Sequence, residues 1–311
     1  MQNLPGFAIE AYDLRAVNDS AYGVRERMLV GRFVDNDEFL RKRTDFPLAF
    51  CAILLYNNTN YGEGVVCVSE VIAVLSGKGG TGKTSVCAGV STALAELGQK
   101  VLCIDCDIGL RNLDISLGMS QAGALSFLDV VQGGYALEQA AQHDMFPNLY
   151  FLTAPVSCSA DEIEGSCFSQ LLQRAAERFD YVFLDAPAGV EAGFRLAARF
   201  ANRVVLVTCA DPASIRDAER TGVLLELMGK ENVRLVVNRV HRKMFSAMDI
   251  TVDDIMDQTG LPLLGLVPED ANVVFAAADG EPLLSYTNKG AAAACCRIAK
   301  RLQGRSVPIT I

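Results

Sequence analysis

The chain has 311 residues, of which 50% are hydrophobic and 21% are charged, and its formal net charge is −9 at pH 7. This length can bury one large core together with a small appendage. The acidic balance argues against a nucleic-acid partner, because binding a phosphate backbone requires basic patches. No run of residues approaches the roughly 20 apolar positions that cross a membrane, so we expect a cytoplasmic protein.

Residues 1–66 are mixed in charge, weakly periodic and carry no recognisable motif. We expect an N-terminal extension of unknown role that is poorly ordered or arises from an incorrectly assigned start site. The second alternative rests on "YGEG" (61–64), which a purine-rich string resembling a ribosome-binding site can encode. Val68 follows closely, and its codon is compatible with a start codon.

From Val71 onward, short apolar runs alternate with helical stretches such as residues 83–98 and 169–179. Seven runs have the length and continuous apolar character of strands that are buried on both faces: VIAVLS, KVLCID, LYFLTA, YVFLDA, RVVLVT, VRLVVN and LLGLVP. This alternation predicts a doubly wound α/β fold, with a mostly parallel sheet and helices on both faces.

The ten cysteines lie in or beside apolar segments, which favours small buried side chains over disulfides. Cys103 and Cys106 spell C-x-x-C within a predicted strand. Residues three apart on a strand face opposite sides, so we do not expect the two thiols to share a metal ion.

The segment "SGKGGTGKTS" (76–85) fits two different nucleotide-binding motifs. Gly77, Gly79 and Gly82 match the G-x-G-x-x-G of a dinucleotide-binding turn. Asp105 even has the spacing of the acidic residue that binds a ribose in that motif. The glycines alone therefore do not decide between a dinucleotide and a triphosphate.

Lys83 and Thr84 favour the triphosphate, because they complete the P-loop motif G-x-x-x-x-G-K-[ST]. The lysine reaches the β- and γ-phosphates and the hydroxyl ligates Mg²⁺, whereas a pyrophosphate turn needs neither. The whole loop is predicted to bind the nucleotide through Gly77, Lys78, Gly79, Gly80, Thr81, Gly82, Lys83, Thr84 and Ser85.

Three carboxylates follow two of the predicted strands. Asp185 ends "YVFLD", where a P-loop protein needs an acidic residue for the magnesium shell. Asp105 and Asp107 lie at the end of "VLCID" and are two residues apart, so we expect them to point together into the site. One of these two carboxylates can orient the attacking water.

The segment "GKGGTGKT" resembles the deviant Walker A motif, in which a lysine follows the first glycine. Four further segments resemble the septum-site-determining members of the MinD/ParA family of P-loop ATPases: "DCDIGLRNLDISLG", "DAPAGVEAG", "SIRDAER" and "LVPEDANVVFAAADGEPL". The resemblance covers about residues 70–305. It implies an ATPase domain with the P-loop NTPase fold, which we assign to residues 67–311.

The resemblance also implies an activity, cofactors and partners. The protein is expected to bind ATP and Mg²⁺, to form a homodimer when ATP-bound, and to hydrolyse ATP to ADP and phosphate with stimulation by a partner. Its expected role is the spatial regulation of division-site placement, with protein partners of the MinC/MinE type.

The same resemblance suggests residue roles. Lys78 corresponds to the signature lysine that reaches the partner subunit's nucleotide, and Asp217 to a dimer contact that holds this lysine. Asp107 is the expected water-positioning carboxylate and Asp105 supports the magnesium shell with Thr84 and Asp185.

The resemblance further implies contacts with the adenine base. Asn238 is expected to read the amide edge of the base, and Pro268 with Glu269 to line it. His143 and His241 have no neighbours in the sequence that suggest catalysis, so we expect them to be ordinary core or surface residues.

The chain departs from the family at its C-terminus. Family members usually carry a terminal amphipathic helix that lies in the membrane interface. Here "RIAKRLQGR" offers only Ile298 and Leu302 as large apolar residues. We therefore expect this stretch to pack the last helix onto the sheet, which puts peripheral attachment to the inner face of the cell membrane in doubt.

Several other functions remain open. A related ParA-like ATPase that positions chromosomes, flagella or other cargo shares the loop, although the acidic balance and "GLRNLD" disfavour DNA partitioning. An iron–sulfur carrier would need cysteines such as Cys158 or Cys167 at a dimer interface, but neither has a recognisable ligand spacing. Lys83 and Thr84 disfavour a nicotinamide oxidoreductase.

Overall fold

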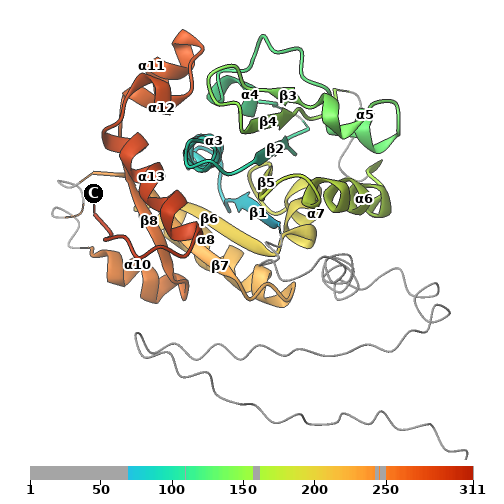
Figure 1. Ribbon diagram of the computed structural model, residues 1–311. Coiled ribbons are helices and arrows are strands. Elements are labelled where there is room, and N and C mark those ends of the chain that lie inside the picture. Colours follow the sequence, from blue (N-terminus) through green and yellow to red (C-terminus); the bar gives the residue numbers. More distant parts are fainter. Residues whose placement is uncertain (1–68, 109, 157–161, 242–244, 246–249, 311) are drawn as a thin grey trace, which may run out of the picture. The chain divides into compact units, whose positions relative to one another are not determined.

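The computed structural model describes residues 69–108, 110–156, 162–241, 245 and 250–310 (Figure 1). The extension predicted for residues 1–66 lies outside the described residues, as does Cys158. Among the helices of the described part, none is both long and apolar enough to cross a membrane.

One sheet forms the centre of the described domain, with the strand order β3-β4-β2-β5-β1-β6-β7-β8. The strands are β1 (Glu70–Leu75), β2 (Val101–Asp105), β3 (Ala141–Gln142), β4 (Leu149–Leu152), β5 (Tyr181–Asp185), β6 (Arg203–Cys209), β7 (Val233–Val240) and β8 (Leu263–Pro268). All seven predicted strands are present. The two-residue strand β3 was not predicted, and it is the one that pairs antiparallel, with β4.

The strands are joined by helices that pack on the two faces of the sheet. The helices are α3 (Lys83–Glu96), α4 (Leu113–Ser116), α5 (Phe127–Val131), α6 (Gly165–Ala176), α7 (Ala192–Phe200), α8 (Pro212–Leu227), α10 (Val252–Thr259), α11 (Asn272–Asp279), α12 (Leu283–Tyr286) and α13 (Gly290–Leu302), with a 3₁₀ turn, η1 (Leu137–Gln139). The structure therefore confirms the predicted doubly wound α/β fold.

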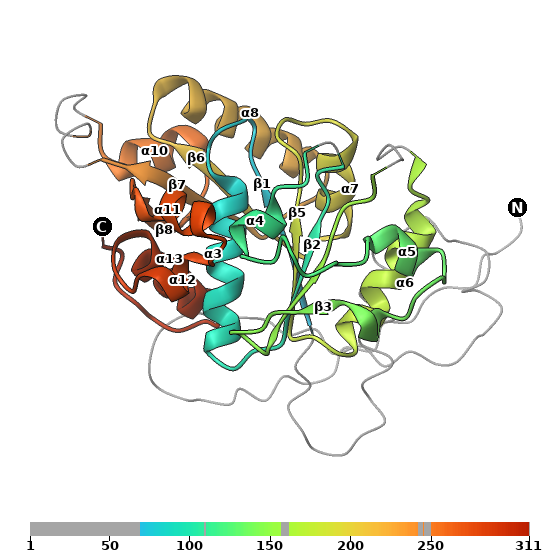
Figure 2. The ribbon, with the colours of Figure 1, turned by 90° about the horizontal axis from the view of Figure 1, so that it is seen from above.

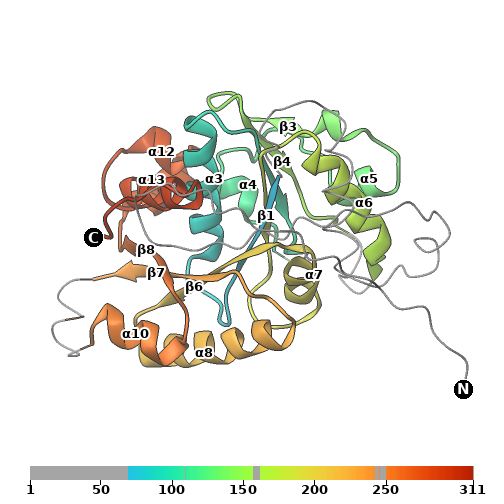
Figure 3. The same cartoon turned by 60° about the horizontal axis from the view of Figure 1, so that its bottom comes forward.

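Alternation along β1 divides the core into two apolar clusters. Val71, Ala73 and Leu75 face the cluster that includes side chains of α5, α6, α7, α8 and α10. Ile72 and Val74 face the other cluster, with α3, α4, α12 and α13. Figure 3 shows α8 and α10 on one side of the sheet and α3, α12 and α13 on the other. A strand in this position must be apolar on both faces, which explains the continuous hydrophobic runs.

The same alternation determines on which face of the sheet each cysteine of the C-x-x-C pair lies. Cys103 belongs to the cluster under α3 and Cys106 to the opposite cluster, so the two thiols lie on opposite faces of the sheet. This confirms the predicted placement of the two side chains on opposite faces.

The last helix, α13, packs against α3 and β8, away from the α5–α6 end of the sheet (Figure 2). Ile298 is 1% exposed and Leu302 is 4% exposed. The two large apolar residues of the C-terminal stretch are therefore buried in the core, as predicted.

Candidate functional site

The P-loop runs from the end of β1 to the first turn of α3. Its first glycine, Gly77, lies so close to α8 that a Cβ atom would stand 2.7 Å from the carbonyl oxygen of Asp217 and would overlap the Thr221 hydroxyl. Gly82 caps the N-terminus of α3 with a left-handed φ of 81°, which glycine adopts without steric cost. These two glycines fix the turn that brings backbone N–H groups to the carboxyl edge of the sheet.

Lys83 is the first residue of α3, and its ammonium group is buried beside a carboxylate. The Lys83 Nζ atom lies 2.8 Å from Oδ1 of Asp185, and both side chains are almost fully buried. Burial lowers the pKa of Lys83, but the Asp185 carboxylate outweighs it and holds that pKa above its ordinary value. A buried lysine needs such an anion, so this ammonium is held charged at the place where the phosphates of a P-loop ligand bind.

Asp105 and Asp185 end neighbouring strands at the same height. The two residues are direct partners in the parallel pairing of β2 with β5. Asp105 accepts hydrogen bonds from the backbone N–H groups of Asp107, at 2.8 Å, and Leu113, at 3.3 Å. Burial, and then the neighbouring Asp185 carboxylate, raise the pKa of Asp105 to about 7. Two buried carboxylates this close repel each other unless a cation lies near them.

The oxygen atoms around this pair fit Mg²⁺. The Thr84 hydroxyl lies beside this pair, with its Oγ1 atom 3.4 Å from Lys83 Nζ, and it helps to lower the pKa of Asp185 against the larger effect of burial, which raises that pKa. Mg²⁺ prefers hard oxygen donors and is commonly held by one or two carboxylates together with substrate phosphates. Within the described residues, no group of three or more His, Cys, Asp or Glu side chains forms a metal site. The donors present here, one hydroxyl and two carboxylates, are of the type that Mg²⁺ binds together with substrate phosphates.

Asp107 lies two residues beyond the end of β2, half-buried next to the carboxylate pair. Its charge contributes to the raised pKa values of both Asp105 and Lys83. Its Oδ1 atom accepts a weak hydrogen bond from the Leu110 backbone N–H at 3.4 Å. Asp107 therefore lies in the loop that follows the strand, close to the buried charges, as the sequence suggested.

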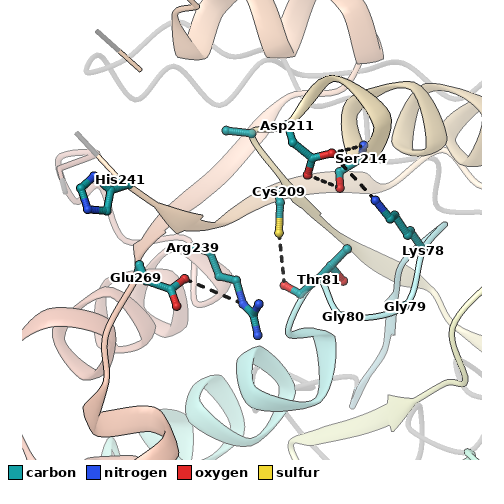
Figure 4. Close-up of a pocket in the computed structure, with 11 residues that line it drawn as sticks. Lys78, Gly79, Gly80, Thr81, Cys209, Asp211, Ser214, Arg239, His241 and Glu269 are labelled. Atoms are coloured by element: carbon teal, nitrogen blue, oxygen red, sulfur yellow. Dashed lines mark hydrogen bonds and ion pairs between the residues drawn. The ribbon is translucent and has the colours of Figure 1, made fainter. Parts of the chain in front are cut away.

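A cleft of about 380 Å³ opens beside the P-loop (Figure 4). It is lined by Lys78, Gly79, Gly80, Thr81, Cys209, Ala210, Asp211, Ser214, Arg239, His241 and Glu269. The Lys78 Nζ atom lies 3.9 Å from Oδ1 of Asp211, with 46% and 41% of the two side chains exposed. The second lysine of the loop thus lies in this open cleft and not in the buried site of Lys83.

Asp211 also begins helix α8. Its carboxylate accepts hydrogen bonds from the Ser214 backbone N–H at 3.0 Å and the Ser214 hydroxyl at 2.5 Å. Partial burial raises the pKa of Asp211, but the Ser214 bonds and the nearby Lys78 charge lower it by more, so it lies below its ordinary value. Lys78 therefore pairs with a carboxylate that also caps the N-terminus of α8.

Asp217 follows Asp211 by six residues on α8 and is half-buried. Its carbonyl accepts the Thr221 hydroxyl at 2.6 Å and lies against Gly77 at the start of the loop. The structure thus brings Asp217 beside the loop that carries Lys78. Within the subunit, however, Lys78 forms its ion pair with Asp211.

Asn238, near the end of β7, contacts the P-loop directly. Its Nδ2 atom donates to the Thr81 carbonyl at 2.8 Å, and Cys209 of the adjacent strand places its sulfur 3.9 Å from the same oxygen. Asn238 is paired in register with Cys209. The asparagine predicted to read a base therefore also holds the loop in place, a role that the sequence did not suggest.

A second, smaller hollow of about 60 Å³ lies next to this contact, lined by Gly82, Ser85, Val86, Asn238, Arg239, Val267, Pro268, Glu269, Asp270, Val273, Val274, Leu283, Ala291 and Cys295. It brings together Asn238, Pro268 and Glu269, the three residues predicted to meet the base. Its walls are mostly apolar, which suits a planar ring.

Two charged residues of the cleft, Asp211 and Arg239, were not predicted from the sequence. Asp211 had a usable signal, because an aspartate that precedes a proline after an apolar strand is typical of a helix N-terminus. Arg239 had none, since it lies between Asn238 and Val240 within an apolar run. His241 is exposed at the edge of the cleft, whereas His143 is buried in the core, as expected for residues without a catalytic partner.

Comparison with known proteins identifies the family and its fold. A family model described as the CobQ/CobB/MinD/ParA nucleotide binding domain matches residues 72–283. The chain is 38% identical over 244 residues to the septum site-determining protein MinD of Synechocystis sp., covering 78% of this chain and 92% of the relative. It is 37% identical over 251 residues to MinD of Bacillus subtilis, with the same coverage of 78% and 92%.

Similar solved structures belong to the same family. The MinC:MinD cell division protein complex of Aquifex aeolicus contains a chain that is 36% identical, with a TM-score of 0.72 and coverage of 78% of this chain and 99% of that chain. MinD of Pyrococcus horikoshii complexed with Mg-ADP is 28% identical, with a TM-score of 0.64 and coverage of 75% and 96%. The loop, the buried lysine and the oxygen donors described above fit ATP and Mg²⁺. The chain therefore belongs to the MinD/ParA family of P-loop ATPases, as an ATPase of the MinD type that acts in division-site placement.

Proposed function

We propose that residues 67–311 form an ATP-operated dimerisation switch, in which ATP closes two copies of the chain and hydrolysis to ADP and phosphate reopens them. The observation that carries this proposal is the contrast between two lysines of one loop. Lys83 is buried against Asp185, whereas Lys78 lies in an open cleft in a weak pair with Asp211.

The buried side of the site serves the subunit's own nucleotide. We assign Lys83 and the backbone N–H groups of the loop to the phosphates, and the oxygens of Thr84, Asp105 and Asp185 to Mg²⁺. When bound, Mg²⁺ neutralises phosphate charge. Asp107 orients the attacking water, since it lies beside these carboxylates in a loop that is open enough to admit one.

The exposed side serves the dimer. Lys78 leaves Asp211 and stabilises the charge on the partner subunit's triphosphate, with Asp217 holding it in the closed state. An exposed ion pair contributes only about 0 to 1 kcal/mol, so exchanging it for a triphosphate is favourable. A nucleotide can shift the monomer–dimer equilibrium only if it interacts better with the dimer, and a lysine supplied in trans provides that difference.

The base binds in the smaller hollow, with Pro268 and Glu269 lining it and Asn238 at its inner end. Asn238 then contacts both the base and the P-loop, because its amide group also donates to the Thr81 carbonyl. This arrangement lets occupancy of the hollow stabilise the P-loop.

We further propose a protein partner of the MinC type, which recognises the closed dimer, and a partner of the MinE type, which stimulates hydrolysis. The support is the similarity to a MinD chain that was solved in complex with MinC. We place the protein in the cytoplasm, without strong direct attachment to the membrane through residues 290–310. ATP-dependent co-sedimentation with anionic vesicles would contradict this placement.

The decisive experiment is light scattering after size exclusion at saturating ATP, with an Asp107→Ala background to retain the triphosphate. Adding Lys78→Ala should abolish the dimer while ATP binding stays near normal. Lys100→Ala is the matched control, because this exposed lysine precedes β2 at the opposite edge of the sheet. A double variant that dimerises as fully as Asp107→Ala alone would refute the trans role.

A further inference from the structure

Arg239 has an unusual backbone conformation. Its φ is 54°, and Arg111, with a φ of 48°, is the one other non-glycine residue with positive φ in the described part of the chain. The pairing of β7 with β8 is irregular between Val237 and Val240, so Arg239 lies in a local break of the ladder. A left-handed backbone is sterically unfavourable for arginine, and such strain gathers at functional sites.

The break directs the Arg239 side chain to the junction of the two hollows. Arg239 lines both the cleft beside the P-loop and the smaller hollow at Pro268. Its Nε atom would lie 4.0 Å from a Cβ atom on Gly82, the residue that caps α3. The guanidinium group therefore lies next to the N-terminal end of the P-loop helix, as Figure 4 shows from the cleft side.

This position is electrostatically unfavourable for a cation without an anion nearby. The N-terminus of α3 carries a partial positive charge, and Lys78 lines the same cleft. Glu269 offers partial compensation, with its Oε2 atom 3.9 Å from Arg239 Nε. The two side chains are 55% and 54% exposed, so this pair is weak and can rearrange.

Arg111 differs in this respect, because its Nε atom donates to the Thr153 hydroxyl at 3.0 Å. That bond ties Arg111 to β4 and gives its backbone conformation a structural reason. Arg239 instead forms the loose pair with Glu269, which leaves its backbone conformation without a comparable structural reason.

A nucleotide bound as proposed has its base in the smaller hollow near Pro268 and its terminal phosphates near Lys83, and it passes Gly82, which lines that hollow and directly precedes Lys83. The part that crosses the junction is the sugar with the α-phosphate. A guanidinium group binds phosphate oxygens through a planar pair of N–H donors, which suits this location.

We propose that Arg239 binds the α-phosphate of the nucleotide and that its strained backbone is retained for this contact. The inference rests on the proposed function, because it assumes a nucleotide with its base in the smaller hollow and its phosphates at the P-loop. It adds a binding residue that the P-loop motif does not contain.

The test is calorimetric binding of ATP and of ADP, each with Mg²⁺, to the full chain and to Arg239→Asn. Asparagine tolerates a positive φ, so this variant removes the guanidinium group without adding strain. We expect the affinity for ATP and ADP to fall by the same factor, about 10-fold or more, since a hydrogen bond to a charged group contributes about 1.5 to 3 kcal/mol. The thermal midpoint without nucleotide should not fall.

Arg234→Gln is the matched control, because Arg234 is an exposed arginine on the same strand that lines neither hollow. It should bind both nucleotides like the unchanged chain. Arg239→Gln provides a second variant, with the same change in net charge as the control, and should show the same loss as Arg239→Asn.

Three outcomes would overturn the inference: unchanged affinity in both Arg239 variants, a loss for ATP but not ADP, or an equal loss in Arg234→Gln. A chain that binds no nucleotide at all would refute the proposed function instead. The two failures are therefore distinguishable in one set of titrations.

Discussion

Lys83 and Lys78 belong to one short loop, but the structure gives them opposite environments. Lys83 is 6% exposed and contacts a buried carboxylate at 2.8 Å. The side chain of Lys78 is 46% exposed and pairs with a half-exposed carboxylate at 3.9 Å. Breaking the first pair is strongly destabilising, because it leaves a buried charge without a partner. The second pair contributes little free energy, so Lys78 can exchange Asp211 for another anion. One loop thus combines a fixed cation with a movable one.

The contrast predicts first that Lys83→Ala is the most damaging change. It should abolish measurable ATP binding and lower the free energy of unfolding by about 3 to 5 kcal/mol, since Asp185 remains buried and unpaired. Urea denaturation and calorimetry measure the two effects. Lys78→Ala is the control and should alter the unfolding free energy by less than about 0.5 kcal/mol.

A second variant separates charge pairing from ligand binding. In Lys83→Met/Asp185→Leu, apolar side chains replace the buried pair, so stability should recover in large part while ATP binding stays lost. If Lys83→Ala and Lys78→Ala destabilised the protein equally, the comparison between the two lysines would not hold.

The free energy of unfolding should also depend on pH through the buried carboxyl of Asp105. Because the pKa of Asp105 is raised to about 7, its folded-state contribution to stability is fully present below the ordinary value of 3.8 and is lost as pH rises to about 7. The slope is at most about 1.4 kcal/mol per pH unit for one group. Urea titrations of the nucleotide-free protein in EDTA, from pH 4 to pH 8, should show a smaller decline for Asp105→Asn than for the unchanged chain. Parallel curves would show that this carboxyl is not perturbed.

Asp107 is only half-buried beside the buried charges, so its substitution should affect turnover and not structure. Asp107→Ala should slow ATP hydrolysis by about 10²-fold, as expected for loss of a group that positions water. ATP affinity and the unfolding midpoint should stay near those of the unchanged chain. A variant that hydrolyses ATP at the normal rate would transfer this role to Asp105 or another residue.

The smallest effect is expected on the exposed side. Asp211→Asn keeps a good N-cap for α8 but removes the charge that pairs with Lys78. The ATP concentration at half-maximal dimerisation should fall by up to about fivefold, which corresponds to about 1 kcal/mol. Light scattering over an ATP titration measures this shift. A rise in that concentration would mean that Asp211 supports the closed state instead.

Much of the buried side could be predicted from the sequence. Each of its residues lies at the end of an apolar run or at the start of a helix, and in a parallel sheet those positions share one edge. Asp105 and Asp185 therefore meet in register because both directly end their strands. The same logic placed Lys83 near them, at the first turn after β1.

The contacts around the smaller hollow and the cleft were less predictable, because they join segments distant in sequence. Asn238 reaches the carbonyl of Thr81 across 157 residues, a contact that depends on the order of β6 and β7 in the sheet. The break that turns Arg239 toward the cleft arises from an irregular pairing with β8, which leaves no pattern in the apolar run. Strand β3 was missed because two residues are too few for a periodic signal.

The start of β1 and the segment after α13 meet at the amino edge of the sheet, which offers a position for a fluorescent label. Glu70 opens β1 at the amino edge of the sheet and pairs with Arg203 at the start of β6, at 2.9 Å. Arg203 in turn donates to the Leu302 carbonyl at the end of α13, at 3.2 Å. Arg301 holds the following backbone by donating to the carbonyls of Val307 and Pro308. A fluorophore attached near Ser306 would therefore lie at the edge opposite the nucleotide cleft, where it can report association between copies without obstructing the P-loop.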